Sequence, residues 1–190
     1  MKKTLTALCA LALLGVFSPA AFALEYSFQP TPADLYDLSH PYFYVWGINA
    51  PELAGAEVVS VTLTIQDIND WIGEDNDHLF IHFLDTPSVI GVAEATDGED
   101  PADEFAGQGP LLLDYSDPDD MHHTLAIAID PALFSAYAAD GIFGFGFDPD
   151  CHYFNDGITL SVAVPEPATL LLMGAGLLGL AMVGRKRLAL

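Results

Sequence analysis

The sequence predicts a mainly β protein: a single β-sandwich or jelly-roll-like ectodomain between an N-terminal signal peptide and a C-terminal transmembrane helix. Three observations lead to this fold class. Short segments between residues 24 and 164 alternate apolar and polar side chains with the period of two that is typical of half-buried strands. Clusters of Gly, Pro, Asn and Asp separate these segments, and helical periodicity is scarce. Short strands joined by such turns are typical of two-sheet sandwiches and jelly rolls.

The elements follow one another along the chain with clear boundaries. Asp130 before Pro131, with Gly141 as a stop signal, predicts one short helix that ends near Ala139. The acid-rich stretches 94–104 and 114–120 are expected to be long loops. Trp46 lies in a segment of alternating apolar and polar residues and is expected in the core. Trp71 has acidic neighbours, so the sequence does not decide whether its ring lies in the core or at the surface. Strands are expected at 42–46, 58–65, 78–83, 111–115, 124–129, 142–147 and 158–164.

The charge distribution excludes several classes of partner. The chain has 27 Asp and Glu against 5 Lys and Arg, and residues 24–164 hold 26 of the acids with no Lys or Arg. A body without basic side chains cannot neutralise phosphates, so no nucleic acid is expected as a partner. Its expected partners are cations and neutral molecules, because uncompensated carboxylates repel one another in a compact state.

The N-terminus has the features of a signal peptide, residues 1–23. Lys2 and Lys3 precede an apolar run, and the small residues Ala21 and Ala23 match the cleavage pattern of signal peptidase. The apolar run of about 13 residues is shorter than the roughly 20 that span a bilayer, which argues against the alternative of an uncleaved anchor. We expect cleavage after Ala23 and an ectodomain over residues 24–163.

The C-terminus has the features of a membrane span. Residues 168–184 contain no charge, and Arg185, Lys186 and Arg187 follow at once as the basic cluster that stays cytoplasmic. These features predict a transmembrane helix over about 168–184 with a basic tail at 185–187, and they place the body outside the membrane. A buried core helix is the alternative, but neither flank suits one.

A short proline-rich motif stands immediately before this predicted span. Val164 to Leu170 includes Pro165, Glu166 and Pro167, and the order of Pro-Glu-Pro, hydrophobic helix and basic tail over 164–190 resembles the PEP-CTERM sorting signal of Gram-negative bacteria. The resemblance implies export across the inner membrane, transient anchoring, and processing near Pro165 to Pro167 by an exosortase, in bacteria that make exopolysaccharide and biofilm. The block from Gly144 to Ile158 also resembles a segment of several uncharacterised PEP-CTERM β-sandwich ectodomains.

Two acidic loops are the candidate metal site of the body. Calcium binds oxygen ligands, and extracellular modules bind it weakly. Neither loop matches an EF-hand, so a site would have to be assembled in space; the alternative is that the acids form ordinary turns. The candidate ligands are Asp67, Asn69, Asp70, Asp75 and Asp77 in the first loop, and Asp148, Asp150, Asn155 and Asp156 in the second.

Other chemistry is less well supported by the sequence. His78 and His82 would point the same way in a strand but lie about 13 Å apart at 3.3 Å per residue, too far to share one metal. The six histidines are therefore expected at the surface or in loops. After signal removal Cys151 has no partner for an intrachain disulfide, so it is either a buried thiol or a ligand or cross-link between chains.

These observations favour a non-enzymatic, exosortase-sorted surface or matrix protein, stabilised by calcium and associated with extracellular polysaccharide. The alternative is a secreted carbohydrate-active enzyme or a sugar-binding module on a jelly-roll scaffold. Two facing carboxylates in a cleft, with a raised pKa on one, would favour the enzyme. A row of exposed aromatic rings would favour the sugar-binding module.

Overall fold

The computed structural model describes residues 23–70, 78–97, 102–116 and 121–166, together with Gly174 and Gly176. One compact unit spans Glu25–Val164. Its strands are β1 (Ala23–Phe28), β2 (Tyr42–Asn49), β3 (Ser60–Asp70), β4 (Leu79–Leu84), β5 (Gly91–Thr96), β6 (Leu111–Tyr115), β7 (His123–Ile129), β8 (Ile142–Pro149), β9 (Tyr153–Phe154) and β10 (Gly157–Pro165). Its helices are the 3-10 turns η1 (Tyr36–Leu38) and η2 (Pro51–Leu53) and the α-helix α2 (Pro131–Tyr137).

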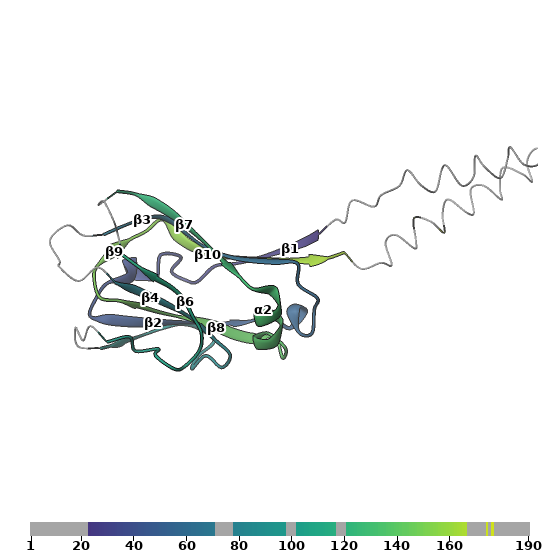
Figure 1. Cartoon of the computed structure of the whole chain (residues 1–190), viewed down its shortest axis with the longest axis horizontal. Helices are drawn as coiled ribbons and strands as arrows, with labels where there is room; N and C mark the ends of the chain where they lie inside the picture. Colours follow the sequence, from purple (N-terminus) through teal and green to yellow (C-terminus); the bar gives the residue numbers. More distant parts are fainter. Residues whose placement is uncertain are drawn as a thin grey trace, which may run out of the picture. The chain divides into compact units, whose positions relative to one another are not determined.

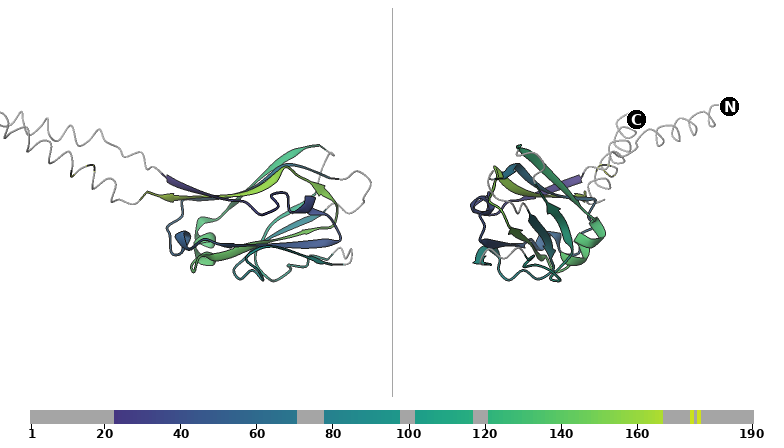
Figure 2. Two further views of the ribbon diagram at one scale, coloured as in Figure 1. Left: turned by 180° about the vertical axis from the view of Figure 1, so that it is seen from behind. Right: turned by 60° about the vertical axis from the view of Figure 1, so that its left-hand side comes forward.

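The strands form two antiparallel sheets, which confirms the mainly β prediction. The first sheet has the order β1-β10-β3-β7, with β9 paired to β3, and the second has the order β5-β2-β8-β4-β6 (Figure 1). The two sheets form two layers (Figure 2). Side chains from both sheets join one hydrophobic core. The chain passes back and forth between the sheets, from β1 to β2, β3 and β4, and again from β6 to β7, β8 and β10. This strand order is that of a jelly roll with β5 added at one edge.

The alternation seen in the sequence sets which side chains enter the core. Leu79, Ile81 and Phe83 of β4 are fully buried, as are Phe143, Phe145 and Phe147 of β8. Burial of one such side chain contributes about 2 kcal/mol of transfer free energy. Trp46 is 3% exposed and belongs to the same core, as expected.

Helix α2 follows the predicted boundaries because its ends are capped. The Asp130 carboxylate accepts hydrogen bonds from the backbone N–H groups of Ala132 and Leu133. Pro131 occupies the first helical position, where its missing N–H has no cost. Gly141 has a φ of +83°, a left-handed conformation that favours glycine, and it ends the turn after the helix.

The structure contains three strands that the pattern did not predict. β1 and β5 are edge strands with many exposed residues, so neither shows a clear apolar face. Glu94 to Thr96 belong to β5, although the sequence predicted a loop over residues 94–104. The loop therefore begins at Asp97. β9 has only two residues and forms through its pairing with β3.

The predicted targeting segments lie outside the described residues, apart from Ala23 at the start of β1, Val164 and Pro165 at the end of β10, and Glu166, Gly174 and Gly176. Trp71 also lies outside them. No helix within the described residues is long and apolar enough to span a bilayer.

Candidate functional site

One end of the two sheets carries most of the acidic loops, and we name it the acidic pole. It comprises the ends of β3, β5, β6 and β8 and the starts of β2, β4, β7 and β10. Gly157 lies opposite Gln66 in the first sheet, and Leu79 lies opposite Pro149 in the second. The short connection from Pro149 through β9 to Gly157 joins these two ends. The acids described there are Asp34, Asp67, Asp70, Asp97, Asp114, Asp148, Asp150 and Asp156. β1 begins and β10 ends at the opposite end of the first sheet, side by side (Figures 1 and 2).

The two loops that were predicted to bind calcium meet at the acidic pole. β9 pairs with the end of β3, so that Asn69 faces Phe154 and Asp70 faces Tyr153. The Cys151 thiol donates to Asp70 Oδ1 over 3.1 Å. The described residues of the two loops are therefore neighbours in space, although about 80 residues separate them in the sequence.

Several of the predicted ligands contribute hydrogen bonds to the fold. Asn155 Oδ1 accepts from the Gly157 N–H over 3.0 Å, and its amide nitrogen donates to the Asp34 carbonyl over 2.9 Å. Asp67 Oδ2 lies 3.1 Å from His122 Nδ1. Asn155 Oδ1 and Asp67 Oδ2 thus hold a turn and a side-chain pair, as the alternative of ordinary turns expects. Asp75 and Asp77 lie outside the described residues.

Asp148 differs from the other acids because it is fully buried. It points away from the core on the outer face of the second sheet, where the residue opposite it on β4 is Phe80. Its Oδ2 accepts the backbone N–H of Glu104 over 2.8 Å, whereas its Oδ1 is buried with no hydrogen-bond partner. Burial, together with the negative charges of Asp97, Asp150 and Asp103, raises the pKa of this carboxyl from 3.8 to about 7, although the hydrogen bond from Glu104 opposes the shift.

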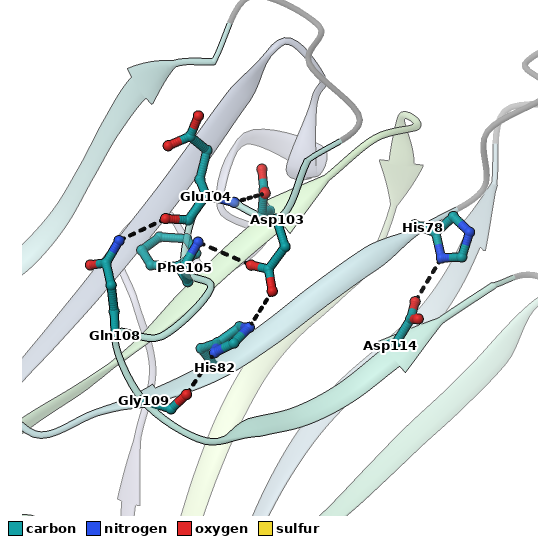
Figure 3. Close-up of polar contacts among 9 residues, drawn as sticks. His78, His82, Asp103, Glu104, Phe105, Gln108, Gly109 and Asp114 are labelled. Atoms are coloured by element: carbon teal, nitrogen blue, oxygen red, sulfur yellow. Dashed lines mark hydrogen bonds and ion pairs between the residues drawn. The ribbon is translucent and has the colours of Figure 1, made fainter.

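The described part of the connection between β5 and β6 that covers Asp148 is residues 102–110, which we name the β5–β6 segment. His82 of β4 is 3% exposed and holds this segment from below (Figure 3). Its Nε2 lies 2.9 Å from Asp103 Oδ2, and its Nδ1 lies 3.1 Å from the Gly109 carbonyl. Both partners are acceptors, so the ring donates to both only when it is doubly protonated.

Further hydrogen bonds give the segment a fixed conformation. Asp103 Oδ1 accepts the Phe105 N–H over 3.0 Å, and the Gln108 side chain donates to the Glu104 carbonyl over 2.6 Å (Figure 3). The Asp103 carboxylate therefore joins the segment to itself and to β4. This arrangement presents the Glu104 N–H to Asp148.

A small apolar cluster on the outer face of the sheet completes the cover. Phe105 is 2% exposed and packs with Val45 and Leu84, with Phe43 at their edge. The Phe43 and Phe105 rings meet edge to face with centroids 5.6 Å apart. Gly146 lies directly beneath the Phe105 ring and leaves the space that the ring occupies.

The positions of His78 and His82 agree only in part with the sequence-based expectation. His78 Nδ1 lies 2.7 Å from Asp114 Oδ1, so His78 and His82 have separate carboxylate partners and do not converge on one metal (Figure 3). His82 is buried, whereas the sequence placed the histidines at the surface. Among the described residues, no three His, Cys, Asp or Glu side chains are close enough together to hold a metal ion by themselves.

Asp97, Asp103 and His82 were not predicted from the sequence as members of the site. A usable signal existed in Gly144 and Gly146, which alternate with inward Phe side chains and therefore face outward. Outward glycines in a strand indicate that another part of the chain approaches closely.

The sorting motif begins where the folded body ends. β10 runs from Gly157 to Pro165 and pairs with β3 up to Ala163, opposite Ser60. Val164 is still buried, while Pro165 and Glu166 are exposed. Ala21, Pro167 and the basic cluster of Arg185, Lys186 and Arg187 lie outside the described residues.

Comparison with protein families agrees with this boundary. The model of the PEP-CTERM protein-sorting motif matches residues 163–187, which confirms the resemblance found in the sequence. The match supports an exported protein that is sorted to the cell surface and processed by an exosortase. A comparison with curated proteins found no match to the chain.

Proposed function

We propose that the chain is a non-enzymatic surface or matrix protein, held at the inner membrane by a C-terminal helix until an exosortase processes it. The observation that carries the proposal is the match to the sorting motif at residues 163–187. The motif begins inside β10 and continues past Val164, which is the last buried residue in the part of the chain that the structure describes. An exosortase can thus reach exposed backbone immediately after the fold.

The position of β10 restricts where processing can occur. β10 lies between β1 and β3 in the first sheet, and Ile158, Leu160 and Val162 are fully buried. Cleavage before Val164 would remove part of a central strand and its ladder to β3. We therefore place the cleavage at or after Pro165, which leaves the body folded.

The state of Asp148 supports a role without catalysis. A glycosidase needs a general acid with a raised pKa that can reach a sugar. The Asp148 carboxyl has a raised pKa, but it is fully buried beneath the β5–β6 segment. A substrate has no access to it while this segment is in place.

Association with extracellular polysaccharide is supported by two exposed rings at the acidic pole. Tyr36 of η1 is 53% exposed and Phe154 of β9 is 41% exposed, and these two elements pack against each other. Aromatic faces suit contact with sugar rings. Calcium in the extracellular layer would in turn compensate the acids around them, as the sequence predicts for the loops at this pole.

Replacement of Pro165, Glu166 and Pro167 by alanine tests the sorting proposal. The variant keeps the predicted signal peptide, body and anchor, so export is expected to continue. The full-length form is expected to accumulate in the inner membrane because the exosortase no longer recognises it. Blotting of membrane, surface and medium fractions for a tag in the body measures this. Processing and release at the parent's level would contradict the proposal.

A further inference from the structure

We propose that Asp148 is a ligand of a calcium ion at the acidic pole, beneath the β5–β6 segment, where the negative charges of Asp97, Asp103 and Asp150 also act. This site differs from the two loops that the sequence predicted. It shares Asp148 and Asp150 with them and adds two acids from the connection between β5 and β6.

The buried oxygen of Asp148 is the first observation for this site. Asp148 is 0% exposed, and its Oδ1 has no hydrogen-bond partner. Buried polar atoms without a protein partner are rare in native proteins, and a bound ion or water is a common reason for one. A proton on this carboxyl would neutralise the charge, but Oδ1 would still lack a partner. A cation satisfies both the charge and the oxygen.

The surroundings of Asp148 are the second observation. Asp103 precedes Glu104, whose N–H contacts Asp148 Oδ2, and Asp150 follows Asp148 by two residues. The charges of Asp97, Asp150 and Asp103 all act on Asp148. Residues 24–164 contain no Lys or Arg, so no such side chain of the body can neutralise this group of acids.

The kinds of ligand atom near Asp148 indicate which class of metal ion the site would bind. The group offers carboxylate oxygens, which suit calcium, and no thiolate or free imidazole that would select zinc or copper. The ring nitrogens of His82 already contact Asp103 and Gly109. Because the described side chains do not complete a set of ligands by themselves, main-chain carbonyls and water must supply the rest. Calcium accepts such ligands, and a weak site with a dissociation constant of about 0.1–1 mM is expected.

The site follows from the contacts of Asp148, and only calcium as its natural occupant rests on the extracellular location proposed above. The sorting proposal and the calcium-site proposal can each be contradicted without the other, because different experiments test them. Sorting is measured by fractionation of cells, whereas calcium binding is measured on purified protein.

Calcium binding to the full chain in detergent tests the site. Thermal unfolding is followed by tryptophan fluorescence in EDTA, in calcium, and in sodium chloride of the same ionic strength. The parent is expected to melt several degrees higher in 10 mM calcium than in the matched sodium chloride. Asp148→Asn should remove this excess, because the amide keeps the shape of the carboxylate but loses its charge. Asp85→Asn is the matched control: Asp85 is exposed at the far end of β4, and its substitution should leave the calcium effect unchanged.

A direct measurement of calcium binding still tests the site if Asp148→Asn does not fold. Equilibrium dialysis with radioactive calcium should show about one site in the parent, with half-saturation in the range above. The double variant Asp97→Asn with Asp150→Asn should raise the half-saturating concentration at least about tenfold, because it removes two neighbouring negative charges. Equal effects of calcium and sodium chloride on the parent would overturn the proposal. An undiminished calcium response in these variants would also overturn it.

Discussion

Phe105 lies across the backbone of Gly146, so close that a Cβ added to Gly146 would come within 2.6 Å of the Phe105 ring. Because Gly146 has no side chain, the Phe105 ring of the β5–β6 segment can pack directly against the backbone of β8. Phe105 and the neighbouring contact between His82 and Asp103 hold the segment against the sheet. The buried state of Asp148 depends on this packing, because the same segment supplies the Glu104 N–H.

Gly146→Ala should destabilise the body by about 1–3 kcal/mol, because the added methyl group overlaps the Phe105 ring and forces the segment outward. Phe105→Ala should cost about 3–5 kcal/mol through lost burial. In the double variant the methyl group has room, so Gly146→Ala should then cost little. Urea unfolding of the four proteins measures the coupling. Additive costs would show that the two residues do not contact each other.

Asp148 should make stability depend on pH in buffer that contains EDTA. Its folded pKa of about 7 lies above the ordinary value of 3.8, so the folded protein holds this proton more tightly than the unfolded chain does. The resulting stabilisation is complete below pH 3.8, falls as the pH rises, and is lost above pH 7. Asp148→Asn has no such proton. The variant should therefore become more stable relative to the parent between pH 4.5 and pH 8, by up to a few kcal/mol.

The comparison is best made as a difference between proteins, because other carboxyl groups also titrate in this range. Asp85→Asn makes the same change of charge at an exposed position. Its stability relative to the parent should stay nearly constant with pH. A constant difference for Asp148→Asn as well would mean that the pKa of this carboxyl is not raised.

The strands, the helix and the inward face of each strand could be predicted because they depend on local patterns. In the predicted strand 78–83, Leu79, Ile81 and Phe83 are the alternate apolar residues and are fully buried, and Asp130 with Pro131 begins the predicted helix. These signals lie within a few residues of the element that they define. Edge strands such as β5 give weaker signals, since they bury little on either face.

The candidate site depends on long-range packing, and the sequence gives no direct signal for that. Alternation places Asp148 on the outer face of β8, where a carboxylate is normally solvated. Its burial results from a segment more than 40 residues earlier that lies over it. The two acidic loops likewise meet only because β9 pairs with the end of β3. The outward Gly146 was a sign of close approach, but it did not identify Phe105 as the residue that approaches.

Cys151 should behave as an inert buried thiol. It is 0% exposed, and its Sγ donates a hydrogen bond to Asp70 Oδ1 in the interior of the acidic pole. A thiol reagent such as Ellman's reagent cannot reach the sulfur until the protein opens. Processed native protein should therefore react slowly, at a rate that follows unfolding, and should react completely in denaturant.

Two controls distinguish burial from the alternative of a link between chains. Cys151→Ser keeps a hydroxyl donor for Asp70 and should remove the signal that appears on unfolding, while leaving the melting temperature within a few degrees of the parent's. Non-reducing gels of the processed protein should show a monomer, since the sulfur has no exposed surface for another chain to reach. Rapid reaction of the native protein with one equivalent of reagent, or a dimer that reducing agent dissociates, would show that Cys151 is accessible and that the β3–β9 end of the pole opens in solution.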